Sequence, residues 1–165
     1  MNELTDGLVG RIKETLAAHP DLSDLRFDDA YSPRPKPAPF KTVLVTLSWN
    51  GIECVPGAMG GYLGEREGSA LFGRKALCRV GVRIHAPESS GGKSCAAVFS
   101  RLCDVLCFDR GGLPLLEAVT CGKTVYDGSA SAFALEGEFV FRGYLAQSEE
   151  TAAFEKIVVK GGPKP

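Results

Sequence analysis

The chain has 165 residues, of which 44% are hydrophobic and 24% charged, an ordinary globular composition that argues against wholesale disorder. Its 19 basic and 20 acidic residues leave a formal net charge of -1, so charge gives no reason to expect nucleic acid or an anionic membrane as the main partner. No apolar run approaches the roughly 20 residues that span a bilayer, and residues 1–6 lack the features of a signal peptide. We therefore expect a protein of the cytoplasm.

The cysteines fit a reducing compartment. They form no CxxC pair, and cysteines of this kind usually behave as small buried hydrophobic residues. We expect all of them to be reduced and to lie in the core. The six are Cys54, Cys78, Cys95, Cys103, Cys107 and Cys121.

The first predicted element is an amphipathic helix over residues 2–18, which ends before Pro20. One apolar stripe faces a core, because its members recur at helical spacing. The stripe consists of Leu4, Leu8, Ile12 and Leu16, with Val9 alongside. A short extended piece near residues 25–27 follows.

A proline-rich segment comes next. Pro33, Pro35, Pro37 and Pro39 alternate with other residues, and proline favours an extended backbone that donates no amide hydrogen. Residues 33–39 are predicted to form a stiff, exposed arm. The alternation contains no PxxP spacing, so it only weakly suggests a ligand of SH3 domains.

A β-hairpin is predicted after the arm. Residues 40–49 alternate as a strand, Asn50-Gly51 is a strong signal for a two-residue turn, and residues 52–55 would return. Residues 56–73 contain six glycines and are predicted to form a long, flexible loop.

The second half of the chain alternates between strand and helix patterns. A long strand is predicted over residues 74–85, with alternate apolar residues facing a core, and an amphipathic helix over residues 93–108. Two closing strands over residues 114–126 and 130–146 are joined by a turn at Asp127-Gly128. Within the second of these strands, Glu136, Glu138 and Arg142 share the polar face.

These elements predict one α+β domain over residues 1–146 and a polar C-terminal tail over residues 147–165. The expected fold is a mixed, mostly antiparallel sheet with two helices packed on one face, in the order α-β-β-β-α-β-β. In the tail, residues 157–159 are apolar and could add an edge strand or dock on a neighbouring chain.

No set of residues predicts catalysis, a cofactor or a metal. Gly92-Lys93-Ser94 lies between a strand and a helix, but the phosphate-loop pattern needs glycine where the chain has Pro87. Cys103 and Cys107 could reach one metal from a helix face, yet zinc needs about four ligands and neither His19 nor His85 is placed to join them. Neither histidine has an evident acidic partner. We therefore expect a protein that is not an enzyme.

The order of elements resembles that of the tail-terminator, or tail-completion, proteins of long-tailed bacteriophages and prophages. The resemblance covers nearly the whole chain. It rests on the amphipathic start over residues 4–16, the strands over residues 40–49 and 76–85, the helix over residues 93–108, the closing strands as far as Leu145, and the glycine-rich loop before Ala76. The proline-rich arm and the C-terminal tail depart from the family pattern.

The resemblance implies a structural protein of virion assembly. Such a protein forms a homo-oligomeric ring, commonly a hexamer, which caps the tail tube, stops its polymerisation and joins it to the head-neck proteins. It would be found in the cytoplasm of the bacterial host during assembly and then in the virion tail. Charged residues of both signs are candidates for subunit or tube interfaces: Arg66, Arg79, Arg83, Glu136, Glu138 and Arg142. The alternative is a small-molecule or peptide-binding domain of bacterial origin.

Overall fold

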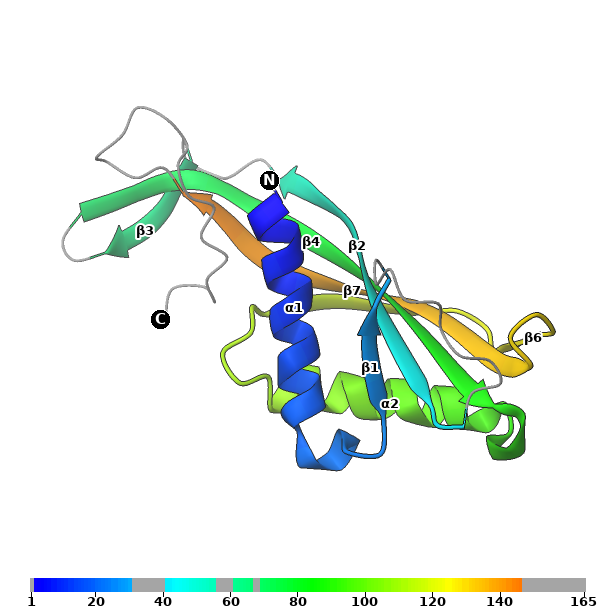
Figure 1. Cartoon of the computed structure of the whole chain (residues 1–165). Helices are drawn as coiled ribbons and strands as arrows, with labels where there is room; N and C mark the ends of the chain where they lie inside the picture. The colour runs from blue at the N-terminus through cyan, green and yellow to red at the C-terminus, as the bar shows by residue number, and fades with distance from the viewer. Residues whose placement is uncertain (1, 31–40, 56–60, 67–68, 147–165) are drawn as a thin grey trace.

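The computed structural model describes residues 2–30, 41–55, 61–66 and 69–146, which form a twisted seven-stranded sheet and two α-helices (Figure 1). The main path of the sheet is β1-β2-β4-β7-β5, with β3 paired to β4 and β6 paired to β7. Only the β1–β2 pair is parallel. The α+β class and the mixed, mostly antiparallel sheet are thus confirmed. The elements are α1 (Asn2–Ala18), β1 (Arg26–Asp29), β2 (Leu44–Val55), β3 (Tyr62–Arg66), β4 (Ser69–Pro87), α2 (Lys93–Phe108), β5 (Leu116–Cys121), β6 (Val125–Asp127) and β7 (Ala132–Ala146).

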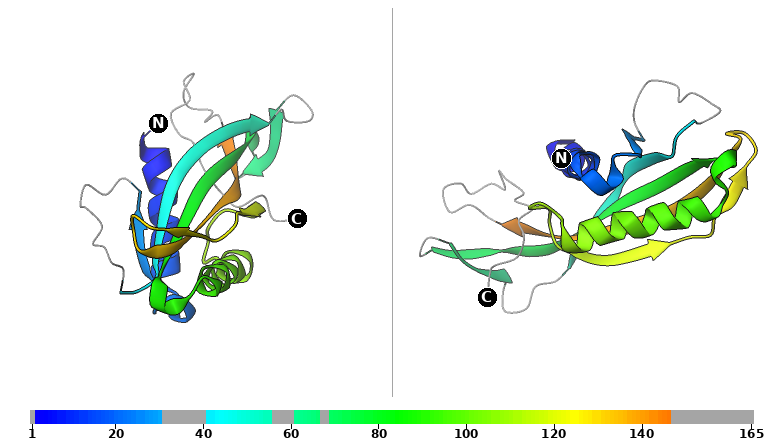
Figure 2. Two further views of the ribbon diagram at one scale, coloured as in Figure 1. Left: turned by 90° about the vertical axis from the view of Figure 1, so that its right-hand side faces the viewer. Right: turned by 90° about the horizontal axis from the view of Figure 1, so that it is seen from below.

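Both helices contribute to one hydrophobic core on the same face of the sheet (Figures 1 and 2). On α2, Phe99 stacks on Phe139 of β7 with ring centroids 5.5 Å apart. On α1, the predicted stripe is confirmed where its side chains are described, because Leu8, Ile12 and Leu16 are buried. Among the described residues, no helix is long and apolar enough to cross a membrane.

Strand β4 is the longest element of the sheet. The predicted strand over residues 74–85 is confirmed and extends at both ends, to Ser69 and Pro87. It pairs with β2 on one side and with β7 on the other. The inward residues predicted from the alternation are all buried: Ala76, Cys78, Val80, Val82 and Ile84.

The predicted hairpin at Asn50-Gly51 is wrong. Strand β2 runs without a turn from Leu44 to Val55 and pairs with β4 throughout, with a bulge between Trp49 and Gly51. Gly51 has a φ of 141°, which L side chains rarely adopt, so glycine suits this bulge as well as it would suit a turn. Asn50-Gly51 indicated an unusual backbone conformation but not whether it would be a turn or a bulge. Pairing of β2 with the long strand β4 decides in favour of the bulge.

The expectation of a structureless loop over residues 56–73 is also wrong in part. Strand β3 pairs with the first residues of β4, in the register Tyr62 with Phe72 and Arg66 with Ser69. Strands β3 and β4 therefore form a two-stranded antiparallel ribbon. The rings of Tyr62 and Phe72 meet edge to face with centroids 5.9 Å apart, which stabilises a glycine-rich ribbon whose backbone propensity is weak.

The closing strands differ from the prediction in one respect. The segment over residues 114–126 is divided into β5 and β6, which pair with successive parts of β7. The turn at Asp127 is confirmed, because its carboxylate accepts hydrogen bonds from the backbone N–H groups of Ser129 and Ala130. With β1, β3 and β6 added and β2 unbroken, the element order is α-β-β-β-β-α-β-β-β.

The cysteine prediction holds for only half of the residues. Cys78 and Cys95 are buried and Cys103 is half-buried, whereas Cys54, Cys107 and Cys121 are exposed. All six are free thiols. Cys54 and Cys121 lie near the exposed ends of β2 and β5, and Cys107 lies on the exposed face of α2. The predicted proline-rich arm over residues 33–39 and the tail over residues 147–165 lie outside the described residues.

We expect Gly137→Ala to lower the free energy of unfolding by about 1–3 kcal/mol, because overpacking a tight site costs about that much. A Cβ at Gly137 would lie 2.6 Å from Cε2 of Phe99 and 2.7 Å from the carbonyl oxygen of Thr120. Gly128→Ala is the matched control, since no atom lies within 4 Å of a Cβ there. Urea denaturation measures both, and equal midpoints for the two variants would contradict the packing of α2 on β7.

Candidate functional site

The outer face of the sheet, opposite the helices, contains five of the six predicted interface residues. Arg79 and Arg83 lie on β4, and Glu136, Glu138 and Arg142 lie on β7. The antiparallel pairing places Arg83 directly opposite Glu136. The sixth residue, Arg66, ends β3 at the far end of the ribbon, and its side chain lies outside the described residues.

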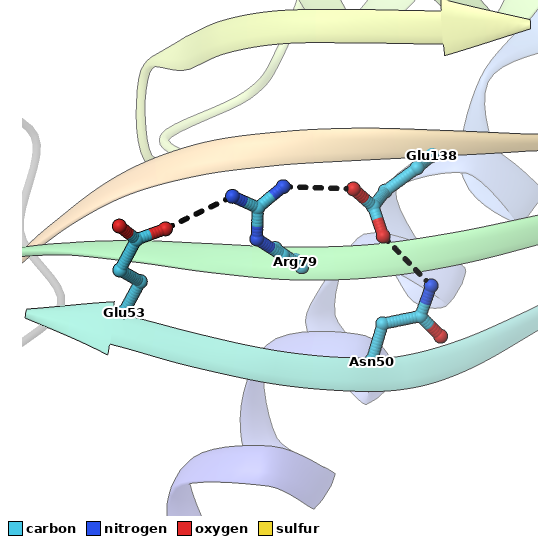
Figure 3. Close-up of polar contacts among 4 residues, drawn as sticks. All are labelled: Asn50, Glu53, Arg79 and Glu138. Atoms are coloured by element: carbon cyan, nitrogen blue, oxygen red, sulfur yellow. Dashed lines mark hydrogen bonds and ion pairs between the residues drawn. The ribbon is translucent and has the colours of Figure 1, made fainter.

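A hydrogen-bonded chain of four side chains crosses three strands at the centre of this face (Figure 3). Arg79 Nη2 donates to Glu53 at 2.9 Å and Arg79 Nη1 to Glu138 at 3.1 Å. Asn50 Nδ2 donates to the other oxygen of Glu138 at 2.9 Å. The hydrogen bond from Asn50 and that from Arg79 hold the pKa of Glu138 below its usual value. The bulge in β2 therefore places Asn50 where it completes this chain.

A second cluster lies towards the β5 side of the same face. Arg142 Nε donates to Glu117 of β5, and Lys75 Nζ lies 2.6 Å from the same carboxylate oxygen. These contacts, with that from Arg142 the larger, lower the pKa of Glu117 from 4.5 to about 2. The carboxylate of Glu117 thus stays ionised through the physiological range.

The charges on this face balance one another. A third ion pair joins Arg83 to Glu136 at 2.6 Å. Together the three groups hold four basic and four acidic side chains, which gives no net charge; we call this set the charge ladder. Its members are Glu53, Lys75, Arg79, Arg83, Glu117, Glu136, Glu138 and Arg142. The five predicted residues on this face therefore pair within the chain. A partner that covers them would meet a neutral, hydrogen-bonded surface.

A hollow of about 620 Å³ opens beside the ladder on the same face. Its floor contains Gly81, where a Cβ would lie 2.5 Å from Ser48 Oγ. Two of its lining residues, Thr46 and His85, belong to this outer face and are nevertheless almost fully buried. The hollow is lined by Ala30, Thr46, Ser48, Asn50, Gly81, Val82, Arg83, His85, Ser129, Ala130, Glu136 and Gly137.

The other candidate groups do not converge on a reaction centre. His19 has an acidic partner that the sequence did not reveal, since Nε2 lies 3.0 Å from Asp109, and this contact ties the end of α1 to the end of α2. Burial raises the pKa of Cys78 and of Cys103 to about 11, which keeps both thiols protonated. Within the described ranges, no group of three or more His, Cys, Asp or Glu side chains could hold a metal ion.

Several residues of the face were missed by sequence reasoning. Glu53 and Glu117 belong to strands whose register the sequence did not reveal, and Asn50 was assigned to a turn. Lys75 was not among the candidate residues, although it lies on β4. The available signal was the alternation of β4 itself, because acidic residues on the same face of a paired strand can lie opposite its outward cations.

Comparison with known proteins finds no protein-family model that matches the chain and no curated protein that is significantly similar to it.

We expect the stabilising effect of Glu117 to depend on pH. Because the folded-state pKa of Glu117 is depressed from 4.5 to about 2, its contribution is complete above about pH 5 and is lost as the pH falls towards 2. Glu117→Gln should therefore lower the free energy of unfolding at pH 7 by about 1 kcal/mol at most, since partly exposed ion pairs contribute little. The difference from the wild type should shrink on acidification.

Urea denaturation at pH 7, 4 and 2.5 measures this difference. Glu88→Gln, which removes an exposed carboxylate beyond the end of β4, is the matched control and should show no such trend. A constant difference between Glu117→Gln and the wild type across the three pH values would contradict the ion pairing.

Proposed function

We propose that the chain is a structural protein of phage or prophage virion assembly, of the tail-terminator kind. In this role it forms a homo-oligomeric ring, of six copies as is common in that family, at the end of the tail tube. The ring stops tube polymerisation and presents a surface to the head-neck proteins. The protein would act in the cytoplasm of the bacterial host and remain in the virion tail.

The observation that carries the proposal is the part of the sheet that extends past the core. Strand β3 and the first residues of β4 form a two-stranded ribbon that projects beyond both helices (Figures 1 and 2). Tyr62 and Phe72 on this ribbon are about half exposed. A two-stranded ribbon with exposed aromatic side chains is only marginally stable by itself and is typical of a contact surface for another protein.

The charge ladder agrees with a role in assembly. A large polar face with no net charge and internally paired side chains can be covered by a partner without leaving a lone charge buried. The members of the ladder are paired with one another, whereas catalysis usually relies on a titratable group held in a perturbed environment. The ladder therefore supports docking to protein surfaces better than it supports turnover.

The test uses purified tail-tube protein from the phage or prophage that encodes the chain. Adding the chain to polymerising tubes should shorten them and place a ring of density at their ends, both measured by negative-stain electron microscopy. An unrelated protein of similar size is the control. Tubes of unchanged length with bare ends would contradict the proposal.

The hollow favours a second candidate function, the binding of a small polar ligand or a short peptide. Its volume of about 620 Å³ lies in the range of ligand sites, and Arg83, His85 and Glu136 supply polar groups of several kinds. Such a ligand would use the exposed part of the Arg83 guanidinium for orientation.

A thermal-shift screen of metabolites, nucleotides and short peptides tests this candidate. A true ligand should raise the melting temperature of the wild type by several degrees, and Arg83→Ala should remove the rise. Arg74→Ala, which changes an exposed arginine on the same strand but outside the hollow, should leave it intact. A screen without a hit, or a rise that survives Arg83→Ala, would count against the hollow as a binding site.

A further inference from the structure

The first surface of interest is the ribbon formed by residues 62–66 and 69–73, which we call the hairpin extension. The last described pairings that anchor it to the sheet are Val55 with Lys75 and Gly73 with Ala146. From Ser69 to Phe72, β4 pairs only with β3 among the described residues. The extension therefore has no layer of described residues beneath it, and its Tyr62–Phe72 pair is 47% and 48% exposed.

The second surface is the free side of β5 and β6, which we call the β5–β6 edge. Both strands pair with β7, and no other described strand pairs with them. Four large apolar side chains along this segment are 37–58% exposed: Leu115, Val119, Val125 and Tyr126. An edge strand with unpaired backbone groups and exposed apolar side chains is a template for pairing with another strand.

Charge distinguishes this edge from the opposite edge of the sheet. Strand β1 carries Arg26, Asp28 and Asp29 among its four residues, the kind of charged edge that discourages pairing. On β5 the only charged residue is Glu117, which is already engaged by Arg142 and Lys75 on the outer face. On β6 the only charged residue is Asp127, whose carboxylate accepts hydrogen bonds from Ser129 and Ala130, and exposed Lys123 lies between the two strands. The nine residues of β5 and β6 therefore carry two charges, against three charges in the four residues of β1.

The extension projects at one end of the long axis of the sheet, β6 lies at the other end, and β5 runs along the middle of β7 between them (Figures 1 and 2). The extension of one chain cannot reach the β5–β6 edge of the same chain, but it can reach that of a second copy. A contact between two different surfaces of identical chains is heterologous, and repetition of it gives a closed ring or an open filament. The exposed aromatic pair of the extension and the exposed apolar side chains along the edge also match in chemistry, as strand addition requires.

The size of the contact favours a ring over a dimer. The extension offers ten residues, 62–66 and 69–73, whereas a standard stable interface uses about 20–30 residues a side. One such contact is therefore too small to hold two chains firmly. In a closed ring every chain makes the contact twice, so the ring persists where an isolated dimer does not.

From these observations we infer that the hairpin extension of one copy docks on the β5–β6 edge of the next copy and that this contact closes the ring. The inference rests on the proposed assembly function and names the surfaces that perform it.

Two double variants separate the surfaces. Tyr62→Ser/Phe72→Ser removes the apolar side chains of the extension, and Val119→Lys/Val125→Lys places charges on the edge. All four side chains are exposed, so circular dichroism and melting temperatures should stay close to those of the wild type. By light scattering after size exclusion, the wild type should be a closed oligomer and each variant alone should be a monomer.

Mixing the two variants supplies the decisive result. The variant changed at the edge keeps an intact extension, and the variant changed on the extension keeps an intact edge, so one contact can form between them. A 1:1 mixture should therefore show association by sedimentation velocity at high concentration that neither variant shows alone. If the mixture stays monomeric while the wild type forms a ring, the contact is not heterologous between these surfaces and the inference fails.

A cross-link locates the contact directly. Cys121 is an exposed native thiol at the β5–β6 edge, so Phe72→Cys should give an intermolecular disulfide to Cys121 under mild oxidation, identified by peptide mass spectrometry. Cys121→Ser in the same background should abolish it. Rings that form equally well in both double variants would overturn this inference but leave the proposed function standing. A wild type that neither forms rings nor caps tail tubes would overturn both.

Discussion

Strand β4 is the constraint on which the rest of the structure depends. Its 19 residues pair with β2, β3 and β7, so its register fixes where three other strands lie. Because its side chains alternate strictly, it sends Cys78 and Val80 into the core and Arg79 to the outer face. A slip of one residue would exchange these faces, bury guanidinium groups under the helices and expose the core. The hydrophobic pattern therefore sets the register, and the charged face follows from it.

The bulge in β2 shows how one extra residue serves both faces. Trp49 pairs with Val80 and Ile52 with Cys78, so both lie on the helix side even though they are three residues apart. The extra residue, Asn50, faces outward and donates its hydrogen bond to Glu138. The bulge thus keeps Trp49 and Ile52 on the helix side while it completes the polar chain on the other face.

The features of the outer face and of the sheet ends agree with a protein that functions through contacts with other chains. The charge ladder is neutral and internally bonded, no described layer lies beneath the hairpin extension, and the strands of the β5–β6 edge carry only Glu117 and Asp127 as charged residues. The hollow beside Arg83 and His85 is the one described feature that suits a ligand instead. The proposed assembly role uses the first three features, and the second candidate function uses only the last.

The sequence by itself determined the two helices, the long strand over residues 74–85 and the class of fold, because amphipathic periods over ten or more residues reflect burial that no other arrangement satisfies. It did not determine which strands pair. Asn50-Gly51 reads locally as a turn, and residues 62–66 read as loop, since local backbone preference is weak where glycine is frequent. Only the tertiary structure, through the length of β4, made Asn50 a bulge and residues 62–66 a strand. The same long-range pairing brought Glu53 and Glu117 to Arg79 and Arg142, because cross-strand neighbours are distant in sequence and leave no local signal.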